Sequence, residues 1–376
     1  MQVEQRVLDG TGEWTAASRE LRGVRAHLVF AFGGRRILAD RKIYDRLRAT
    51  YPAARILMAS SAGEFSDTDV LDEKLVVTAV ALEKTRLSSA VLPIGNQLES
   101  YAVGKELALR LKADRLSHVF VLSDGQRVNG TELSRGFNEV LPADVRMTGG
   151  LAADGQRFEK TLVGLSEYPA EGRVAAIGFY GKNFVTGFGT CGGWTPNDVE
   201  HTITSSDGSI LFKLDDMPAL DVYREFIGRD TECTPATCLG YPLWVKIPGR
   251  ETPVVRSVLG IETGTKSLVF AGDVPTGSQA RLMYTRPGDL IRGAETAATS
   301  ANIQSGAELA ICISCVGRRL VLGSTVGDEL TTIRRTLGTS SMIAGFYSYG
   351  ELAPNGHERA CQLHNQTMTI TTFAET

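Results

Sequence analysis

The sequence predicts an α/β fold: mixed layered sheets built from repeated β-α-β-β units, with a β-rich insertion between the second and third units. Two observations support this prediction. Apolar runs of strand length alternate with helix-like segments over most of the chain, as expected for βαβ crossovers. The same order of strand, turn, helix, strand, glycine-bearing turn and strand also occurs three times, which indicates internal repetition.

The first unit contains a helix between two apolar strands, followed by a third strand rich in β-branched residues. Pro52 ends the helix because proline cannot continue it. In order, its elements are the strand His27–Ala31, the turn Gly34-Arg35-Arg36, the helix Arg41–Thr50, the strand Arg55–Ala59, the turn Ser60–Glu64 and the strand Lys74–Leu82.

The other two units repeat this order, and each follows a helix-like segment, at Leu98–Leu111 and Ala294–Gln304. The second unit runs through the strand His118–Leu122, the turn Gly125-Gln126-Arg127, the helix Thr131–Leu141, the strand Val145–Thr148, the turn Gly149–Gly155 and the strand Thr161–Leu165. The third runs through the strand Leu309–Ser314, the turn Cys315–Arg319, the helix Asp328–Leu337, the strand Met342–Tyr347, the turn Ser348–Glu351 and the strand Leu363–Thr367.

The turns of the three units align by their glycines. The separations between first and second turn are 63 − 34 = 29, 155 − 125 = 30 and 350 − 317 = 33 residues, counted between Gly34 and Gly63, Gly125 and Gly155, and Gly317 and Gly350. Loops that follow parallel strands lie together at one edge of a sheet, where α/β proteins bind ligands. Glycine there permits close backbone approach. We therefore expect these turns to form the rim of a shared pocket.

The region Val174–Asp289 differs from the units. It holds short β-like segments separated by proline and glycine, with an amphipathic helix at Asp221–Ile227. We expect a domain boundary near 190–215, which divides the chain into a leader at 1–26 and domains at 27–200 and 201–376.

Composition narrows the class of protein. The 376 residues are 43% hydrophobic and 22% charged, typical of a globular protein, and the net charge of −3 offers no basic face for nucleic acid. No apolar run approaches the length of a membrane span, and residues 1–20 lack the apolar core of a signal peptide. These observations predict a cytoplasmic chain whose six cysteines are thiols rather than a disulfide framework.

Five motifs together resemble the FIST-domain family over about residues 27–372. They are Gly149-Gly150-Leu151-Ala152-Ala153-Asp154-Gly155, Pro218-Ala219-Leu220-Asp221-Val222-Tyr223, Cys315-Val316-Gly317-Arg318-Arg319, Gly345-Phe346-Tyr347-Ser348-Tyr349-Gly350-Glu351 and Leu363-His364-Asn365-Gln366-Thr367. The resemblance implies adjoining FIST N-like and FIST C-like sensory domains at 27–200 and 201–376. It also implies an intracellular sensor of a small ligand, for which an amino acid is one candidate, that signals through a separate protein such as a histidine kinase. One branch of similar proteins binds haem and senses nitric oxide, so haem is an alternative cofactor.

Arginines at the first turns are the first candidates for ligand binding. Arg36, Arg127 and Arg319 end these turns, and a guanidinium can hold a carboxylate or another anion with two hydrogen bonds. The alternative is a surface arginine paired with a nearby acid. The acidic candidates are Asp154 and Glu351 at the second turns.

The C-terminal motifs supply the remaining candidates, Tyr349, His364 and Asn365. Asn365 can both donate and accept hydrogen bonds, and His364 can bind an anion or, in the haem alternative, the iron. His364 can equally bond to the backbone and hold the last strand. Cys312 and Cys315 point to opposite faces of an extended strand, so we expect core thiols rather than a zinc or redox site.

Two other classes of function stay open. A hydrolase of a small amide or cyclic substrate would use a turn serine with an acid beside it, such as Ser348 with Glu351. No nucleophile elbow, phosphate-binding loop or dinucleotide fingerprint accompanies them. A pure interaction scaffold is the other alternative, and it predicts no stabilisation by any metabolite.

Overall fold

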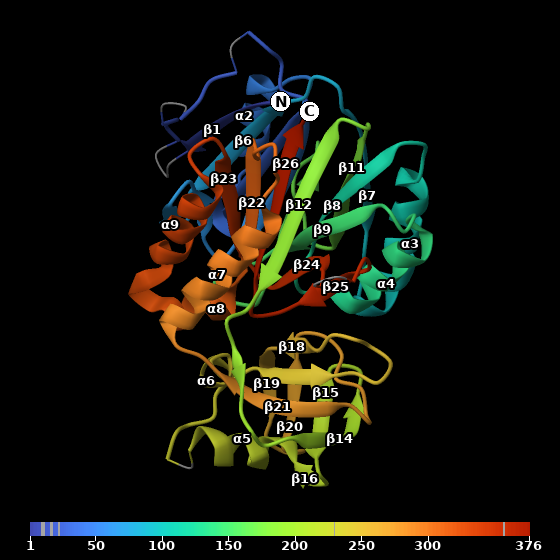
Figure 1. The fold of residues 1–376 in the computed structure, drawn as a ribbon, viewed down its shortest axis with the longest axis vertical. Coiled ribbons are helices and arrows are strands. Elements are labelled where there is room, and N and C mark those ends of the chain that lie inside the picture. Colours follow the sequence, from blue (N-terminus) through green and yellow to red (C-terminus); the bar gives the residue numbers. More distant parts are fainter. Residues whose placement is uncertain (9–11, 16–17, 22, 229, 356–357) are drawn as a thin grey trace.

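The structure, a computed structural model, describes residues 1–8, 12–15, 18–21, 23–228, 230–355 and 358–376. The chain forms an α/β body and a smaller β-rich body beneath it (Figure 1). Both chain ends lie at the top of the α/β body, away from the β-rich body. The predicted α/β class with several mixed sheets is confirmed.

The first sheet has the strand order β1-β6-β2-β3-β10. β2 and β3 are parallel and joined by two helices, while β6 pairs with β2 in the antiparallel direction. Asp40 starts the second helix by accepting a hydrogen bond from the Lys42 amide. In chain order, the elements of residues 2–81 are β1 (Gln2–Leu8), β2 (Leu28–Gly34), α1 (Arg35–Ala39), α2 (Arg41–Thr50), β3 (Arg55–Ser61), β4 (Glu64–Ser66), β5 (Asp69–Leu71) and β6 (Leu75–Ala81). Of these, β4 and β5 belong to the third sheet.

The second sheet has the order β25-β24-β9-β8-β11-β7. β8 and β9 are the parallel pair, and β11 runs antiparallel to β8. Asn129 caps the crossover helix by accepting from the amides of Thr131 and Glu132. In chain order, the elements of residues 86–180 are β7 (Arg86–Pro93), α3 (Ser100–Leu111), β8 (Leu116–Ser123), α4 (Gly130–Val140), β9 (Arg146–Leu151), β10 (Val163–Leu165) and β11 (Arg173–Tyr180). Of these, β10 belongs to the first sheet, and β24 and β25 come from the C-terminal part of the chain.

The third sheet has the order β12-β26-β22-β23-β4-β5. β22 and β23 are parallel, and β26 runs antiparallel to β22. The bounds are β12 (Phe184–Cys191), α7 (Pro287–Ala301), β22 (Leu309–Cys315), α8 (Val316–Leu322), α9 (Val326–Leu337), β23 (Met342–Ser348), β24 (Gly350–Pro354), β25 (Cys361–His364) and β26 (Met368–Glu375).

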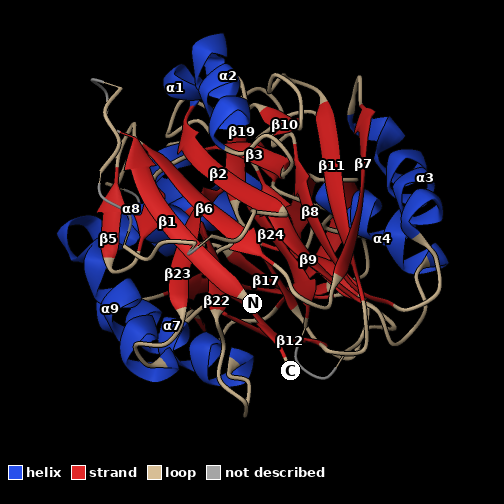
Figure 2. Cartoon of the chain, turned by 90° about the horizontal axis from the view of Figure 1, so that it is seen from above, coloured by secondary structure: helices blue, strands red, loops and turns tan. Residues whose placement is uncertain are grey.

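Each sheet also takes a short strand from another segment: β4 pairs with β23, β24 with β9, and β10 with β3. Seen from above, the helices form three groups around the central strands (Figure 2). The three parallel pairs are therefore tied to one another by exchanged strands. That they are copies of one unit stays a prediction.

Two expected turns are wrong. The Gly34-Arg35-Arg36 and Cys315–Arg319 turns are helical instead, because α1 and α8 begin directly after β2 and β22. Arginine, leucine and isoleucine in these segments tolerate a helix, so the crossover starts without a separate turn. Within the predicted leader, parts of which lie outside the described residues, Gln2–Leu8 pairs with β6 as strand β1.

The β-rich body is built on a nine-stranded sheet with its own apolar core. Its main strand order is β18-β17-β21-β14-β15-β20-β19. The bounds are β13 (Thr195–Pro196), β14 (His201–Asp207), β15 (Ile210–Leu214), β16 (Met217–Pro218), α5 (Ala219–Ile227), α6 (Pro235–Cys238), β17 (Leu243–Lys246), β18 (Val254–Arg256), β19 (Val258–Glu262), β20 (Ser267–Phe270) and β21 (Gln279–Tyr284).

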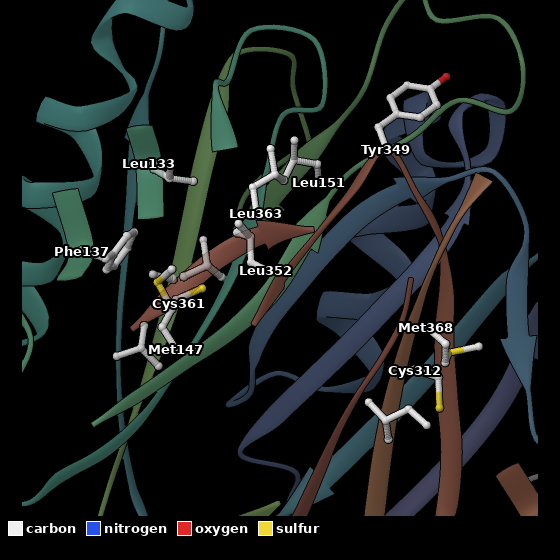
Figure 3. Close-up of a cluster of buried hydrophobic side chains, with 14 of the residues drawn as sticks. Leu133, Phe137, Met147, Leu151, Cys312, Tyr349, Leu352, Cys361, Leu363 and Met368 are labelled. Atoms are coloured by element: carbon white, nitrogen blue, oxygen red, sulfur yellow. The ribbon is translucent and has the colours of Figure 1, made fainter. Parts of the chain in front are cut away.

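Apolar packing fixes the α/β body beneath the expected rim. Leu133 and Phe137 of α4 lie in one buried cluster with Leu352 of β24 and Leu363 of β25 (Figure 3). Burying each such side chain contributes about 1.5–3 kcal/mol. Among the described residues, no helix has both the length and the apolarity that a membrane crossing requires.

Candidate functional site

The ends of the three parallel pairs each carry a buried acid. Glu64, Asp154 and Glu351 stand three residues after the last residue of β3, β9 and β23, respectively. Their exposed fractions are 1%, 0% and 0%. Burying a carboxyl group is costly unless it is neutral or well bonded, so each acid needs a local explanation.

We name the segments at the ends of β3, β9 and β23 the first, second and third corner, respectively. Backbone hydrogen bonds join the three corners in a closed ring. The amide of Ala62 donates to the Tyr347 carbonyl at 2.9 Å, that of Tyr349 to the Leu151 carbonyl at 3.2 Å, and that of Ala153 to the Ser60 carbonyl at 2.9 Å. The second turns are therefore brought together, as the sequence predicts for rim loops.

Glu64 occupies the first corner. One of its carboxyl oxygens accepts a hydrogen bond from the Ser61 hydroxyl, and the other accepts from the Lys74 amide at 3.2 Å. Burial raises the pKa of Glu64 to about 8, and these hydrogen bonds oppose the rise without cancelling it. The carboxyl is therefore largely protonated at neutral pH.

Glu351 occupies the third corner and, like Glu64, accepts a hydrogen bond from a serine three residues earlier. It accepts hydrogen bonds from the hydroxyls of Ser348 at 2.6 Å and Thr367 at 2.8 Å. Burial raises the pKa of Glu351 to about 8 as well. Ser348 and Glu351 both have no exposed surface, so this pair is a core hydrogen bond in this conformation rather than an accessible nucleophile with its base.

Asp154 occupies the second corner, where Leu151 takes the place of a serine. It accepts from the Tyr349 hydroxyl and from Arg35, whose Nη1 lies 2.9 Å from its Oδ2. Tyr349 stacks on Phe158 with ring centroids 4.5 Å apart, and its hydroxyl points away from the leucine cluster (Figure 3). These contacts anchor the loop that follows Asp154.

A cavity of about 540 Å³ lies beside the first corner, and we name it the arginine cavity. Its walls include Ser61, Glu64, Asp72, Arg157 and Arg319. All three sequence segments contribute to it: the corner after β3, the loop after Asp154, and α8. A volume of this order suits a small molecule.

Both arginines of this cavity are held by acids of the loop between β5 and β6. Arg319 donates two hydrogen bonds to Asp72, at 2.8 and 2.7 Å, and Arg157 lies 3.3 Å from Glu73. The Asp72 side chain is 64% exposed. An ion pair this exposed is worth about 0.2–1 kcal/mol, so a competing anion can displace it at low cost.

Gly63 explains how Arg319 reaches the corner. Its φ of +131° lies where side chains are rarely tolerated, and a Cβ placed there would lie 2.5 Å from Nη1 of Arg319. Arg319 also donates to the carbonyl of Ala62. The glycine therefore leaves room for the guanidinium against the backbone of the corner.

Two smaller cavities continue from the arginine cavity toward the β-rich body. The Tyr349 cavity, about 370 Å³, is bordered by Gly125, Leu151 and Tyr349, and the α6 cavity, about 310 Å³, by Pro235 and Leu239. The α6 cavity shares Gln156 and Leu320 with the arginine cavity. It shares Phe158 and Leu259 with the Tyr349 cavity. The loop after Asp154 thus separates three neighbouring hollows.

The predicted arginines have different surroundings. Arg319 borders a cavity, whereas Arg127 pairs with Glu171 and is 46% exposed. Arg36 is exposed on α1, and its neighbour Arg35 is the arginine that reaches Asp154. Arg127 and Arg319 lie four residues beyond the end of β8 and β22, but Arg36 lies only two beyond β2, so the predicted alignment is shifted there.

His364 and Asn365 lie inside the molecule. The His364 ring is 4% exposed, its Nε2 lies 3.0 Å from the Ala353 carbonyl, and burial lowers its pKa to about 4. The amide oxygen and nitrogen of Asn365 are buried and find no partner among the described residues. His364 therefore occupies the position of a strand-holding histidine.

The surroundings of His364 do not fit a haem site. Iron ligation needs a free ring nitrogen facing a space large enough for the macrocycle. Nε2 instead lies 3.0 Å from the Ala353 carbonyl of β24, and His364, which is 4% exposed, borders none of the three cavities described above. No three His, Cys, Asp or Glu side chains form a potential metal-binding group within the described ranges.

The residues predicted to bind the ligand do not include five that border the arginine cavity: Ser61, Glu64, Asp72, Glu73 and Arg157. The equal spacing of Glu64 and Glu351 from their strand ends could have revealed Glu64. No comparable signal marks Asp72, because its contact with Arg319 joins residues 247 positions apart.

Comparison with protein families gives a direct result. The model of the FIST N domain matches residues 27–217, and that of the FIST C domain matches residues 219–354. The chain belongs to the FIST family. FIST domains are sensory domains of signal transduction proteins.

Comparisons with individual proteins add little to the FIST assignment. No curated protein matches the chain. Among solved structures, a cyanuric acid hydrolase from A. caulinodans is similar over 93% of this chain and 90% of its own, with 7% sequence identity and a TM-score of 0.31. A likeness at that level supports no statement about fold or activity.

Proposed function

We propose that this FIST protein senses a small molecule carrying a carboxylate and an ammonium group, such as an amino acid, in the arginine cavity. The single observation that carries the proposal is the pairing of opposite chemistries across one cavity. Arg157 and Arg319 offer guanidinium groups, and Glu64 offers a buried carboxyl group beside Ser61. Guanidinium groups bind carboxylates bidentately, and a carboxylate binds an ammonium group.

Ligand charge also sets the protonation of Glu64. An ammonium group placed beside Glu64 lowers its pKa, because a nearby positive charge favours the ionised form. Since that pKa is about 8 without a ligand, binding at neutral pH releases a proton. An anion without an ammonium group would release none.

Signalling follows from competition for the arginines. The ligand carboxylate replaces Asp72 on Arg319 and Glu73 on Arg157, which frees the loop between β5 and β6. Asp72 and Glu73 are 64% and 43% exposed, so this loop forms part of the outer surface. A ligand shifts such an equilibrium only by its differential affinity, which the exchanged ion pairs supply. A separate partner, such as a histidine kinase, reads the altered surface.

The remaining predicted ligand residues have supporting positions in this proposal. Asp154 and Tyr349 fix the loop that carries Arg157, and Glu351 lies in the neighbouring corner. His364 and Asn365 belong to the segment beneath the corners, where Asn365 retains unmet hydrogen-bonding capacity.

The test is a thermal-shift screen of the standard amino acids and simple carboxylates. A ligand at about 100 times its Kd adds about 2.7 kcal/mol to the apparent stability. We expect at least one amino acid to raise the melting temperature of the wild type and to raise that of Arg319→Ala by at most about half as much at the same concentration. Arg335→Ala is the matched control, since Arg335 is 72% exposed on α9.

Kinase activity tests the signalling part of the proposal separately from ligand binding. The autophosphorylation rate of a histidine kinase that co-purifies with the chain should change with the amino acid in the wild type but not in Arg319→Ala. If no amino acid or carboxylate stabilises the protein, the sensor proposal fails and the scaffold alternative gains support. Loss of a stabilising response in Arg335→Ala as well as in Arg319→Ala would also contradict it.

A further inference from the structure

Two cysteines of the β-rich body bring their sulfur atoms together. Sγ of Cys233 lies 3.2 Å from Sγ of Cys238, and both are free thiols. Thr234 starts the short helix between them by accepting from the Thr237 amide, so the backbone of this segment is defined by its own hydrogen bonds. The other four cysteines, Cys191, Cys312, Cys315 and Cys361, have no such sulfur contact.

The two thiols differ in accessibility. Cys233 is half-buried, whereas Cys238 is fully buried in the core of the β-rich body. Burial and the neighbouring Cys233 raise the pKa of Cys238, which keeps it a thiol. Cys233 is therefore the sulfur that meets an oxidant from solution, and Cys238 is positioned to resolve it.

We propose that Cys233 and Cys238 form a reversible disulfide that adjusts the wall of the α6 cavity. The oxidant is a hydroperoxide. The Cys233 sulfur attacks one peroxide oxygen, the O–O bond breaks, and with hydrogen peroxide one water leaves and Cys233 becomes a sulfenic acid. The Cys238 sulfur then attacks the Cys233 sulfur, the S–O bond breaks, and the thiol proton of Cys238 leaves with the displaced hydroxide as a second water. Two thiols and one peroxide thus give one disulfide and two waters.

The geometry requires a small movement. A disulfide has its sulfur atoms about 2.05 Å apart, so the two sulfurs must approach by about 1 Å. Pro235 and Leu239, which border the α6 cavity, lie between or directly after the two cysteines. Packed interiors transmit a shift of this size to their neighbours.

Leu239 connects this segment to the α/β body. Its carbonyl accepts a hydrogen bond from the Gln366 side chain at 2.9 Å, and the Gln366 carbonyl accepts from the Trp194 indole at 2.9 Å. Gln366 adopts a positive φ of 63°, which is uncommon for a side chain of this kind. The disulfide therefore acts on the joint between the two bodies and gives the sensor a second, redox input.

The test uses the full chain, reduced and then exposed to hydrogen peroxide, and examined by peptide mass spectrometry. We expect the segment containing Cys233 and Cys238 to lose two hydrogens and to recover them with dithiothreitol. Cys233→Ser abolishes this loss, and it is the primary variant because its side chain is only half-buried. Cys191→Ser, at another half-buried thiol, is the matched control and retains it.

Hydrogen exchange measures whether the disulfide affects the contact between the two bodies at Leu239 and Gln366. Hydrogen exchange in a peptide spanning 363–367 should change on oxidation of the wild type and stay unchanged in Cys233→Ser. Stable sulfenic or sulfinic acid at Cys233 without a disulfide would overturn the proposal. So would oxidation of Cys191 while the pair remains reduced, or a disulfide that leaves exchange at 363–367 unaltered.

Discussion

Replacement of Glu64 by glutamine tests whether a neutral carboxyl group stands in the arginine cavity. Its folded pKa of about 8 lies above the ordinary value of 4.5, so between these two values the folded state holds more protons than the unfolded state. Stability must therefore fall as the pH rises through this window. At about 1.4 kcal/mol for each pH unit, Glu64 costs about 3 kcal/mol at pH 7 and about 5 kcal/mol above pH 8.

The variant removes that cost but also loses a hydrogen bond. A glutamine can accept from Ser61, but its NH₂ group would face the Lys74 amide, a loss of about 1–2 kcal/mol. We expect Glu64→Gln to have about the wild-type stability near pH 5.5 and to be about 3 kcal/mol more stable near pH 8.5.

Denaturant unfolding at several pH values measures this difference. Glu106→Gln is the matched control because that carboxyl is 48% exposed on α3. If the stability difference between Glu64→Gln and the wild type is the same at every pH, Glu64 is not a buried neutral acid. The proton release proposed for ligand binding would then fail as well.

Three further substitutions test the packing around the site by denaturant unfolding. Glu351→Gln should flatten the same pH window by a similar amount, since burial raises the pKa of Glu351 to about 8; an unchanged pH slope would contradict this. Glu329→Ala leaves Arg318 buried without its ion-pair partner, so the free energy of unfolding should fall by about 3–5 kcal/mol, whereas a loss below about 1 kcal/mol would show that the pair is not buried. Tyr349→Phe removes a donor to Asp154 and should cost about 1–3 kcal/mol; a neutral result would mean that the corner does not depend on this bond.

The sequence was sufficient for the α/β class, for the three parallel strand pairs joined through helices, and for the meeting of the second turns. These features depend on local patterns: apolar runs, helix-ending prolines and the strand-to-helix crossovers. The exchange of β4, β24 and β10 between sheets was not foreseen. Each of these strands is short, and its partner lies far away in the sequence, so no local pattern specifies the pairing.

The candidate site shows the same limit at the level of single residues. Arg319 was found because a guanidinium after a strand end is an informative pattern. Arg35 was missed in favour of Arg36, because the first residues of a short helix point in different directions that the sequence does not distinguish. Asp72 and Glu73 depend on a loop fold that brings them to arginines of two other segments.

Calorimetric titration of the protein with its most stabilising amino acid tests the central claim most directly. Titrations in two buffers with different heats of ionisation give the number of protons released. At neutral pH we predict release of a proton, and a Kd about 10–150 times weaker for Arg319→Ala, because a charged hydrogen bond contributes about 1.5–3 kcal/mol. Binding that releases no proton and is unaffected by Arg319→Ala would place the ligand outside the arginine cavity.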